Sequence, residues 1–179
     1  MTRKGDRQIG LVSGTVASPI GPLVAIEDET DALFMVEFAD CAGRMDRWLR
    51  HRLASGRYQL RAGAVSAKSR QAFAAYFDGE VGFLRTLPVG LDGTAFQNEM
   101  WTALREVAPG ETLAYGAFAE RLGRPKAARA IGHANGSNPL SVVVPCHRLV
   151  GANGALTNYG GGLERKRWLL DHEARYAGS

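Results

Sequence analysis

The chain has 179 residues, of which 45% are apolar and 22% charged, a composition typical of globular proteins and not of disordered, collagen-like or coiled-coil chains. No run reaches the ~20 apolar residues of a membrane-spanning helix, and the polar start carries no signal peptide, so we expect a cytoplasmic protein without a membrane partner. The balance of 22 Lys and Arg against 18 Asp and Glu is too even to indicate nucleic-acid binding by itself.

The first half of the chain is expected to form a small α+β unit. Short apolar stretches on either side of a Ser-Pro-Ile-Gly-Pro turn predict a hairpin over 10–26, and a further strand follows over 32–38. Apolar residues at helical spacing predict helices over 45–53 and 66–77. A Gly- and Pro-containing stretch over 79–94 then places a domain boundary near residue 90, giving domains 1–90 and 91–179.

The second half is expected to be mainly helical. Thr94 is a good N-cap for a helix over 95–107. Two shorter segments, 115–122 and 126–135, predict a helix-turn-helix, with Pro125 in the first turn of its second helix.

The segment that follows leads to a cysteine. A β-branched run over 141–144 predicts a buried strand that delivers Cys146, and the glycine-rich stretch 151–162 predicts a pocket wall that a ligand can approach closely. An amphipathic helix over 163–175 completes the chain.

Two runs of cations are compatible with a nucleic-acid surface or with a solvated helix face. One extends from Arg44 to Arg61, and the other contains Arg121, Arg124, Lys126, Arg129 and Arg148. Because many two-helix elements never touch DNA, the helix-turn-helix alone leaves a nucleic-acid role open.

Cys146 is the natural candidate for covalent chemistry. A thiol becomes a strong nucleophile as a thiolate, which needs a base or a positive charge nearby, and His147 and Arg148 follow directly. Since side chains of adjacent residues diverge, a water could join Cys146 to His147, and an acid such as Glu173 could orient the base. The alternative is an inert buried cysteine beside a histidine.

Neither a metal nor a nucleotide cofactor is predicted. The residues Cys146, His147, His133 and His172 match no common zinc spacing. The chain also lacks a GxGxxG motif after a strand and the Lys-Ser/Thr of a phosphate loop.

Two blocks of the second half resemble the 6-O-alkylguanine-DNA alkyltransferases. The motifs are Asn138-Pro139, Pro145-Cys146-His147-Arg148 and Tyr159-Gly160-Gly161-Gly162, with Pro125-Lys126-Ala127-Ala128-Arg129-Ala130 ahead of them. The resemblance implies an α+β fold: a small ribonuclease-H-like N-terminal domain, then a mainly helical domain with a helix-turn-helix and an active-site loop.

The resemblance also implies a role for each matching residue. Cys146 would take the alkyl group from guanine, once and irreversibly. His147, held by Glu173 and acting through a water, would keep Cys146 as a thiolate. Asn138 would brace the active-site turns, and the Tyr115 hydroxyl would sit by the base and the DNA backbone and help guanine to leave.

The DNA roles implied by the resemblance fall on the helix-turn-helix. Arg129 would fill the base stack after the damaged nucleotide is flipped out, and Arg124 and Lys126 would contact phosphate. The duplex would be bound through its minor groove, largely independently of sequence, by a monomer. The base pocket would be lined by Leu149, Thr157, Tyr159 and Gly160.

Two other classes of protein fit parts of the pattern. A helix-turn-helix regulator needs no nucleophile, and a cysteine hydrolase needs no basic helix and turns over through an acyl-thioester. The presence of both features favours single-turnover alkyl transfer.

Overall fold

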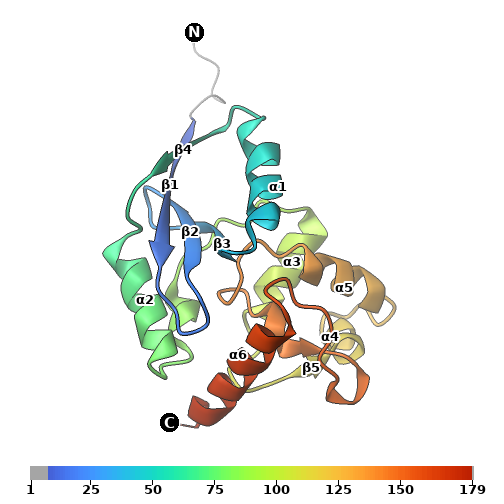
Figure 1. The fold of residues 1–179 in the computed structure, drawn as a ribbon. Helices are drawn as coiled ribbons and strands as arrows, with labels where there is room; N and C mark the ends of the chain where they lie inside the picture. The colour runs from blue at the N-terminus through green and yellow to red at the C-terminus, as the bar shows by residue number, and fades with distance from the viewer. Residues whose placement is uncertain (1–7, 179) are drawn as a thin grey trace.

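The computed structural model describes residues 8–178, and its first half is built around a four-stranded sheet (Figure 1). The strands are β1 (Ile9–Val16), β2 (Leu23–Asp28), β3 (Leu33–Phe38) and β4 (Tyr58–Ala62), in the order β3-β2-β1-β4. The first three are antiparallel neighbours, and β4 runs parallel to β1. The predicted hairpin and third strand are thus confirmed, whereas β4 was not predicted.

Helices cover both faces of this sheet. Helix α1 (Ala42–Leu53) lies on one face, where Trp48 packs in a small cluster with Leu11, Ile26 and Met35. Helix α2 (Ala67–Phe77) contributes to the main core on the other face. It begins one residue after the predicted start, because Ser66 is its N-cap and its hydroxyl accepts a hydrogen bond from the Ser69 amide. A short helix η1 (Phe83–Thr86) follows.

The second half contains four α-helices within the described residues. They are α3 (Ala95–Leu104), α4 (Tyr115–Arg121), α5 (Ala128–Gly136) and α6 (Leu163–Tyr176), with the short helices η2 (Cys146–Arg148) and η3 (Ala152–Gly154) and the two-residue strands β5 (Leu113–Ala114) and β6 (Leu149–Val150). Thr94 caps α3 as predicted, in a capping box with Gln97. Together with the sheet, these helices confirm the α+β fold class.

Two local predictions in this half are wrong. Helix α5 begins at Ala128, so Pro125 lies in the connecting turn and not in the first turn of the helix. Residues 141–144 form a buried turn instead of a strand, in which Val142 has a φ of 70°. The left-handed conformation of Val142 is costly for a β-branched residue, and it reverses the chain just before Cys146.

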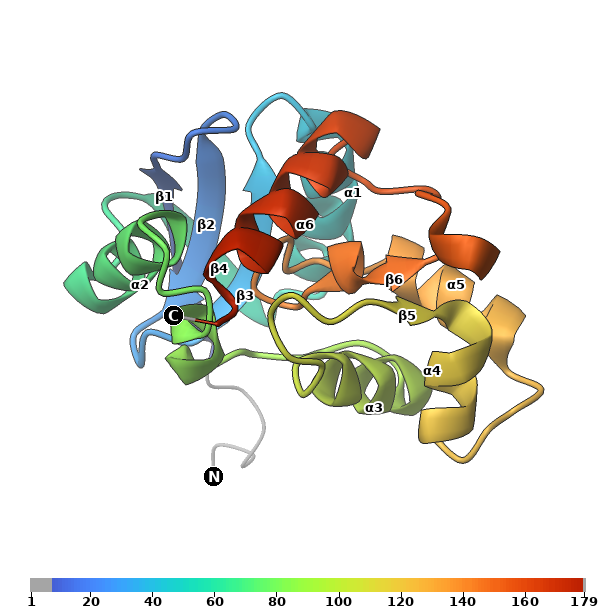
Figure 2. The same cartoon turned by 90° about the horizontal axis from the view of Figure 1, so that it is seen from below.

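One core joins the two halves. Apolar residues of β2 and β3 pack in the same cluster as Trp101 of α3, Phe118 of α4 and Leu169 of α6. Figure 2 shows α6 crossing the junction between the sheet and the helices of the second half. The boundary near residue 90 remains a prediction.

The outer edge of β3 is covered by later parts of the chain. The Val36 amide donates to the Pro139 carbonyl and the Ser141 amide donates to the Val36 carbonyl, both at 2.9 Å. Leu33 is paired in the same way with residues 88–90. The turn that precedes Cys146 is therefore anchored on the sheet.

Candidate active site

Cys146 lies at the start of η2, directly after the buried turn. Its side chain is 6% exposed, and its amide donates to the Val144 carbonyl at 2.7 Å. Asn138 holds the same turn from inside: its side-chain amide donates to the Val144 carbonyl at 2.9 Å and its Oδ1 accepts from the Leu140 amide at 2.9 Å. The bracing contacts expected of Asn138 are present.

Glu173 on α6 is the fully buried centre of a hydrogen-bond network. Its carboxylate accepts from Nε2 of His147 at 2.8 Å and from Nε and Nη2 of Arg148, each at 2.8 Å. The Tyr76 hydroxyl of α2 donates to the same carboxylate at 2.8 Å and the Gly110 amide at 3.3 Å. Arg148 was expected as part of a basic run, and Tyr76, which is 97 residues from Glu173 along the chain, was not predicted.

The network fixes the protonation of the histidine. Burial lowers the pKa of His147, so the ring is neutral at pH 7, and donation from Nε2 to Glu173 leaves Nδ1 as the lone-pair nitrogen. Burial alone would raise the pKa of Glu173, but its contacts with His147 and Arg148 outweigh this effect and hold that pKa far below its ordinary value. Nδ1 is buried and has no hydrogen-bond partner among residues 8–178.

The electrostatics around Cys146 differ from those of a resting thiolate. Burial raises the pKa of the Cys146 thiol, although a contact with Asn138 and the charges of Arg44 and Lys166 act in the opposite direction. Without a substrate the side chain is therefore a thiol at pH 7. A base is then needed at the moment of reaction.

Arg44 of α1 links the sheet to the active-site turn. Its guanidinium pairs with buried Glu37 of β3 at 2.7 Å and donates to the carbonyls of Gly136 and Asn138 at 3.1 and 3.0 Å. A Cβ on Gly160 would lie 2.5 Å from the guanidinium carbon of Arg44, so a side chain there would displace this arginine from its present position. The basic run over Arg44–Arg61 thus has a structural role at its first residue.

Asn135 on α5 connects two of the predicted site residues and was missed. Its side-chain amide donates to the Tyr115 hydroxyl and to the Cys146 carbonyl, both at 3.3 Å. Asn135 is 5% exposed. The only feature of the sequence that could have indicated Asn135 is that a polar residue occupies a core-facing position of the predicted helix.

A buried lysine ties the glycine-rich segment to α6. Nζ of Lys166 donates to the Leu149 carbonyl at 2.6 Å and to the Thr157 carbonyl at 2.9 Å, and burial lowers the pKa of Lys166. The ring of Tyr159 packs edge-on against that of His147, with 6.4 Å between ring centres. The hydroxyls of Thr157 and Tyr159 have no hydrogen-bond partner within the described part of the chain.

The predicted DNA-contacting residues lie on the surface of the helix-turn-helix. Arg129 and Lys126 are exposed at the start of α5 and in the turn before it. Arg124 is also exposed, but it pairs with Glu99 of α3 at 2.9 Å.

The described residues contain neither a metal-binding cluster nor a membrane-spanning helix. No group of three or more His, Cys, Asp or Glu side chains is arranged to hold a metal ion between residues 8 and 178. No helix in that range is long and apolar enough to cross a membrane.

Comparison with known proteins identifies close relatives. Residues 95–175 match the family model of the 6-O-methylguanine DNA methyltransferase DNA-binding domain. The chain is 46% identical over 167 residues to the methylated-DNA–protein-cysteine methyltransferase of Shigella flexneri, covering 91% of this chain and 95% of the relative. The corresponding protein of Methanosarcina acetivorans is 39% identical over 161 residues, covering 87% and 94%.

Solved structures of methyltransferases from the same family have a similar fold. A crystal structure of Mycobacterium tuberculosis OGT in complex with DNA superposes with a TM-score of 0.73 at 37% identity, covering 94% of each chain. An O6-methylguanine-DNA methyltransferase from Pyrococcus kodakaraensis superposes with a TM-score of 0.66 at 26% identity, covering 91% of this chain and 98% of the other.

Proposed function

Because the chain belongs to the methylated-DNA–protein-cysteine methyltransferase family, we propose that Cys146 is the residue that accepts the alkyl group from 6-O-alkylguanine in duplex DNA. The protein repairs DNA by direct reversal. Membership of this family excludes the two alternatives left open by the sequence, a helix-turn-helix regulator and a cysteine hydrolase. One observation carries the assignment of the cysteine: Cys146 precedes a histidine whose ring is fixed by a buried carboxylate. The thioether product has no labile bond, so each molecule acts once.

In the proposed reaction, Sγ of Cys146 attacks the alkyl carbon. The S–C bond forms as the bond from carbon to the guanine oxygen breaks, and guanine leaves with the electron pair. The thiol proton passes through a water to Nδ1 of His147, and the Tyr115 hydroxyl gives its proton to the leaving guanine, which becomes neutral. His147 then releases its proton to water and Tyr115 regains one from water, so both residues return to their starting states. Because burial raises the pKa of the Cys146 thiol, the thiol is not ionised beforehand, and its proton is removed as the attack takes place.

Helix α5 is the proposed DNA-reading element. Beside Arg129 and His133, the residues that α5 exposes fully or partly are small: Ala128, Ala130, Gly132 and Gly136. A slender helix suits the minor groove, which is about 6 Å wide. Arg129 fills the stack left by the flipped base, and a monomer binds without sequence preference.

Lys126 is a better candidate for a phosphate contact than Arg124. Lys126 has no hydrogen-bond or ion-pair partner among the described residues, whereas Arg124 must exchange its pairing with Glu99 for a phosphate. The flipped base is received by a pocket whose proposed lining residues are Leu149, Thr157, Tyr159 and Gly160.

The test is intact-mass analysis after mixing with a duplex that carries 6-O-methylguanine. We expect one added methylene per molecule, on Cys146, and none in Cys146→Ser. Cys41→Ser is the matched control, because Sγ of Cys41 lies 3.6 Å from the Gly160 carbonyl and is the other thiol near the site. Label on Cys41, or several lesions repaired per molecule, would contradict the proposal.

A further inference from the structure

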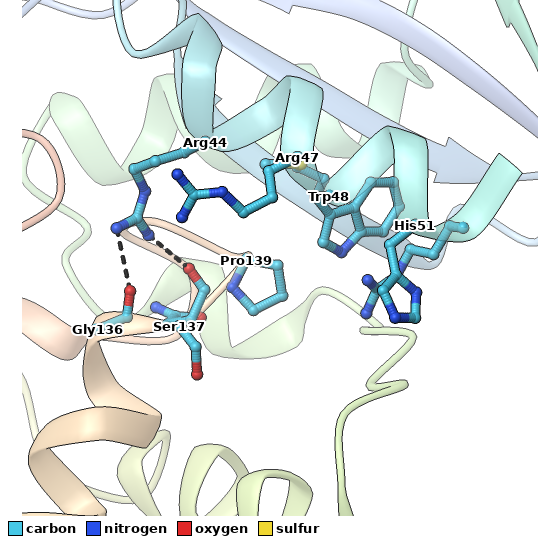
Figure 3. Close-up of a pocket in the computed structure, with 10 residues that line it drawn as sticks. Arg44, Arg47, Trp48, His51, Gly136, Ser137 and Pro139 are labelled. Carbon is cyan, nitrogen blue, oxygen red and sulfur yellow. Dashed lines mark hydrogen bonds between the residues drawn. The ribbon is translucent and has the colours of Figure 1, made fainter. Parts of the chain in front are cut away.

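A basic groove lies between α1 and the segment that follows α5. The groove has a volume of about 240 Å³, and its walls are Met35, Arg44, Arg47, Trp48, His51 and Arg52 on one side and residues 136–139 on the other. Figure 3 shows the side chains of α1 directed toward Gly136, Ser137 and Pro139. Arg44 and Asn138 also hold the active-site turn, but the other wall residues have no role in the alkyl-transfer chemistry described above.

The charges of the groove are unevenly satisfied. Arg44 is paired with Glu37, and Arg52 is paired with Asp92 while it stacks on the Trp48 ring at 4.5 Å. Arg47, in contrast, is exposed and has no hydrogen-bond or ion-pair partner among residues 8–178. The groove therefore keeps an uncompensated positive charge.

Two further donors in the groove lack acceptors. Trp48 is 9% exposed, and its Nε1 is buried without a hydrogen-bond partner within the described residues. Figure 3 shows the indole of Trp48 between Arg47 and His51 on the wall that faces Pro139. His51 is exposed and likewise unpaired in the described part of the chain. A buried indole N–H without an acceptor is costly unless a ligand supplies one.

The groove lies at the end of the proposed DNA-reading helix. Arg129 is near the start of α5, and Ser137, which lines the groove, follows its last residue. At 1.5 Å per residue these two residues are about 12 Å apart along the helix, which is the length of roughly three to four base pairs. A duplex that follows α5 thus brings its backbone to the groove.

We propose that this groove binds the phosphodiester backbone of the same duplex, away from the lesion. Arg47 supplies the charge, Trp48 Nε1 and His51 supply hydrogen bonds, and the occupant is a phosphate of DNA. The Arg44–Glu37 and Arg52–Asp92 pairs hold the walls in place. The inference rests on the proposed function and extends its DNA contact to the first half of the chain.

The test compares salt-dependent DNA binding by three variants, measured by fluorescence anisotropy with a lesion-containing duplex. Arg47→Gln should weaken binding about fivefold and reduce the slope of log K against log salt by about one unit, because one phosphate contact releases about one counterion. Trp48→Phe keeps the ring under Arg52 but removes the donor, so it should weaken binding without changing the slope. Arg50→Gln is the matched control, since Arg50 is an exposed arginine of α1 that does not line the groove.

Duplex length provides the second arm. Shortening the duplex on one side of the lesion should abolish the difference between wild type and Arg47→Gln, and shortening it on the other side should not. An unchanged salt slope in Arg47→Gln, an equal loss in Arg50→Gln, or a loss that survives both truncations would overturn the groove proposal. Methyl transfer from the free 6-O-methylguanine base should be the same in all three variants. Failure of the wild type to gain a methyl group on Cys146 from a lesion-containing duplex would instead refute the role of Cys146.

Discussion

Replacing Glu173 by glutamine tests the buried network most directly. The carboxylate accepts two hydrogen bonds from Arg148, whose side chain is 4% exposed, and one each from His147 and Tyr76. Glutamine keeps one acceptor oxygen but leaves the guanidinium buried without a counter-charge. Breaking a buried pair in this way costs about 3–5 kcal/mol, a large share of the ~5–15 kcal/mol that stabilises a typical domain.

The free energy of unfolding in urea measures this loss. Tyr76→Phe should cost less, about 1.5–3 kcal/mol, because it removes one hydrogen bond to a charged group and keeps the ring in the core. A double variant, Glu173→Gln with Arg148→Met, should be more stable than Glu173→Gln alone because it removes the stranded charge. A loss below about 1 kcal/mol in Glu173→Gln, or simple additivity in the double variant, would refute the reasoning.

The same substitution separates catalysis from DNA binding, because Glu173 orients His147 and lies away from the proposed DNA surface. Single-turnover transfer should slow in Glu173→Gln far more than the dissociation constant for duplex DNA rises. Equal losses in both would mean that α6 only supports the fold.

Three further outcomes are expected. Arg129→Ala should slow repair in duplex DNA and spare transfer from the free base. Equal impairment of the two reactions would show that Arg129 does not fill the base stack. Lys126→Ala should weaken binding to every duplex and lower the slope of log K against log salt by about one unit. Thr157→Gly should widen the pocket and speed reaction with benzyl-type guanines, and an unchanged rate would show that Thr157 does not line it. The folded-state pKa of Glu173 lies below its ordinary value of 4.5, so the unfolded chain binds more protons, and stability should fall as the pH drops below about 4.5. Urea midpoints measured across this pH range should fall less in Glu173→Gln than in the wild type.

Local signals predicted the elements that depend on local chemistry. Thr94 and Ser66 cap their helices through hydrogen bonds to residues three positions later, so a short window of sequence contains both partners. Cys146 and His147 were predicted as site residues from their adjacent residue types, and Asn138 and Glu173 from the family resemblance. Asn138 contacts the turn before Cys146 and Glu173 contacts His147; their roles stay predictions.

Long-range packing explains what the sequence did not predict. The β-branched run over 141–144 favours a strand. In the structure Ser141 donates to the Val36 carbonyl and the Val144 amide donates back to the Leu140 carbonyl, so the run forms a turn with Val142 in the left-handed region. Tyr76 reaches Glu173 only because α2 and α6 pack together. No periodicity within either segment contains that information.

The covering of β3 has a consequence beyond the position of Cys146. All six residues of β3 are buried, and its sequence, Leu-Phe-Met-Val-Glu-Phe, carries a single charge, which Arg44 neutralises. A bare apolar edge of this kind is a template for pairing with other chains and for aggregation. Because residues 139–141 occupy that edge, the turn that presents the cysteine also protects the protein against self-association, and variants that loosen it should be lost as aggregates before they accumulate as inactive monomers.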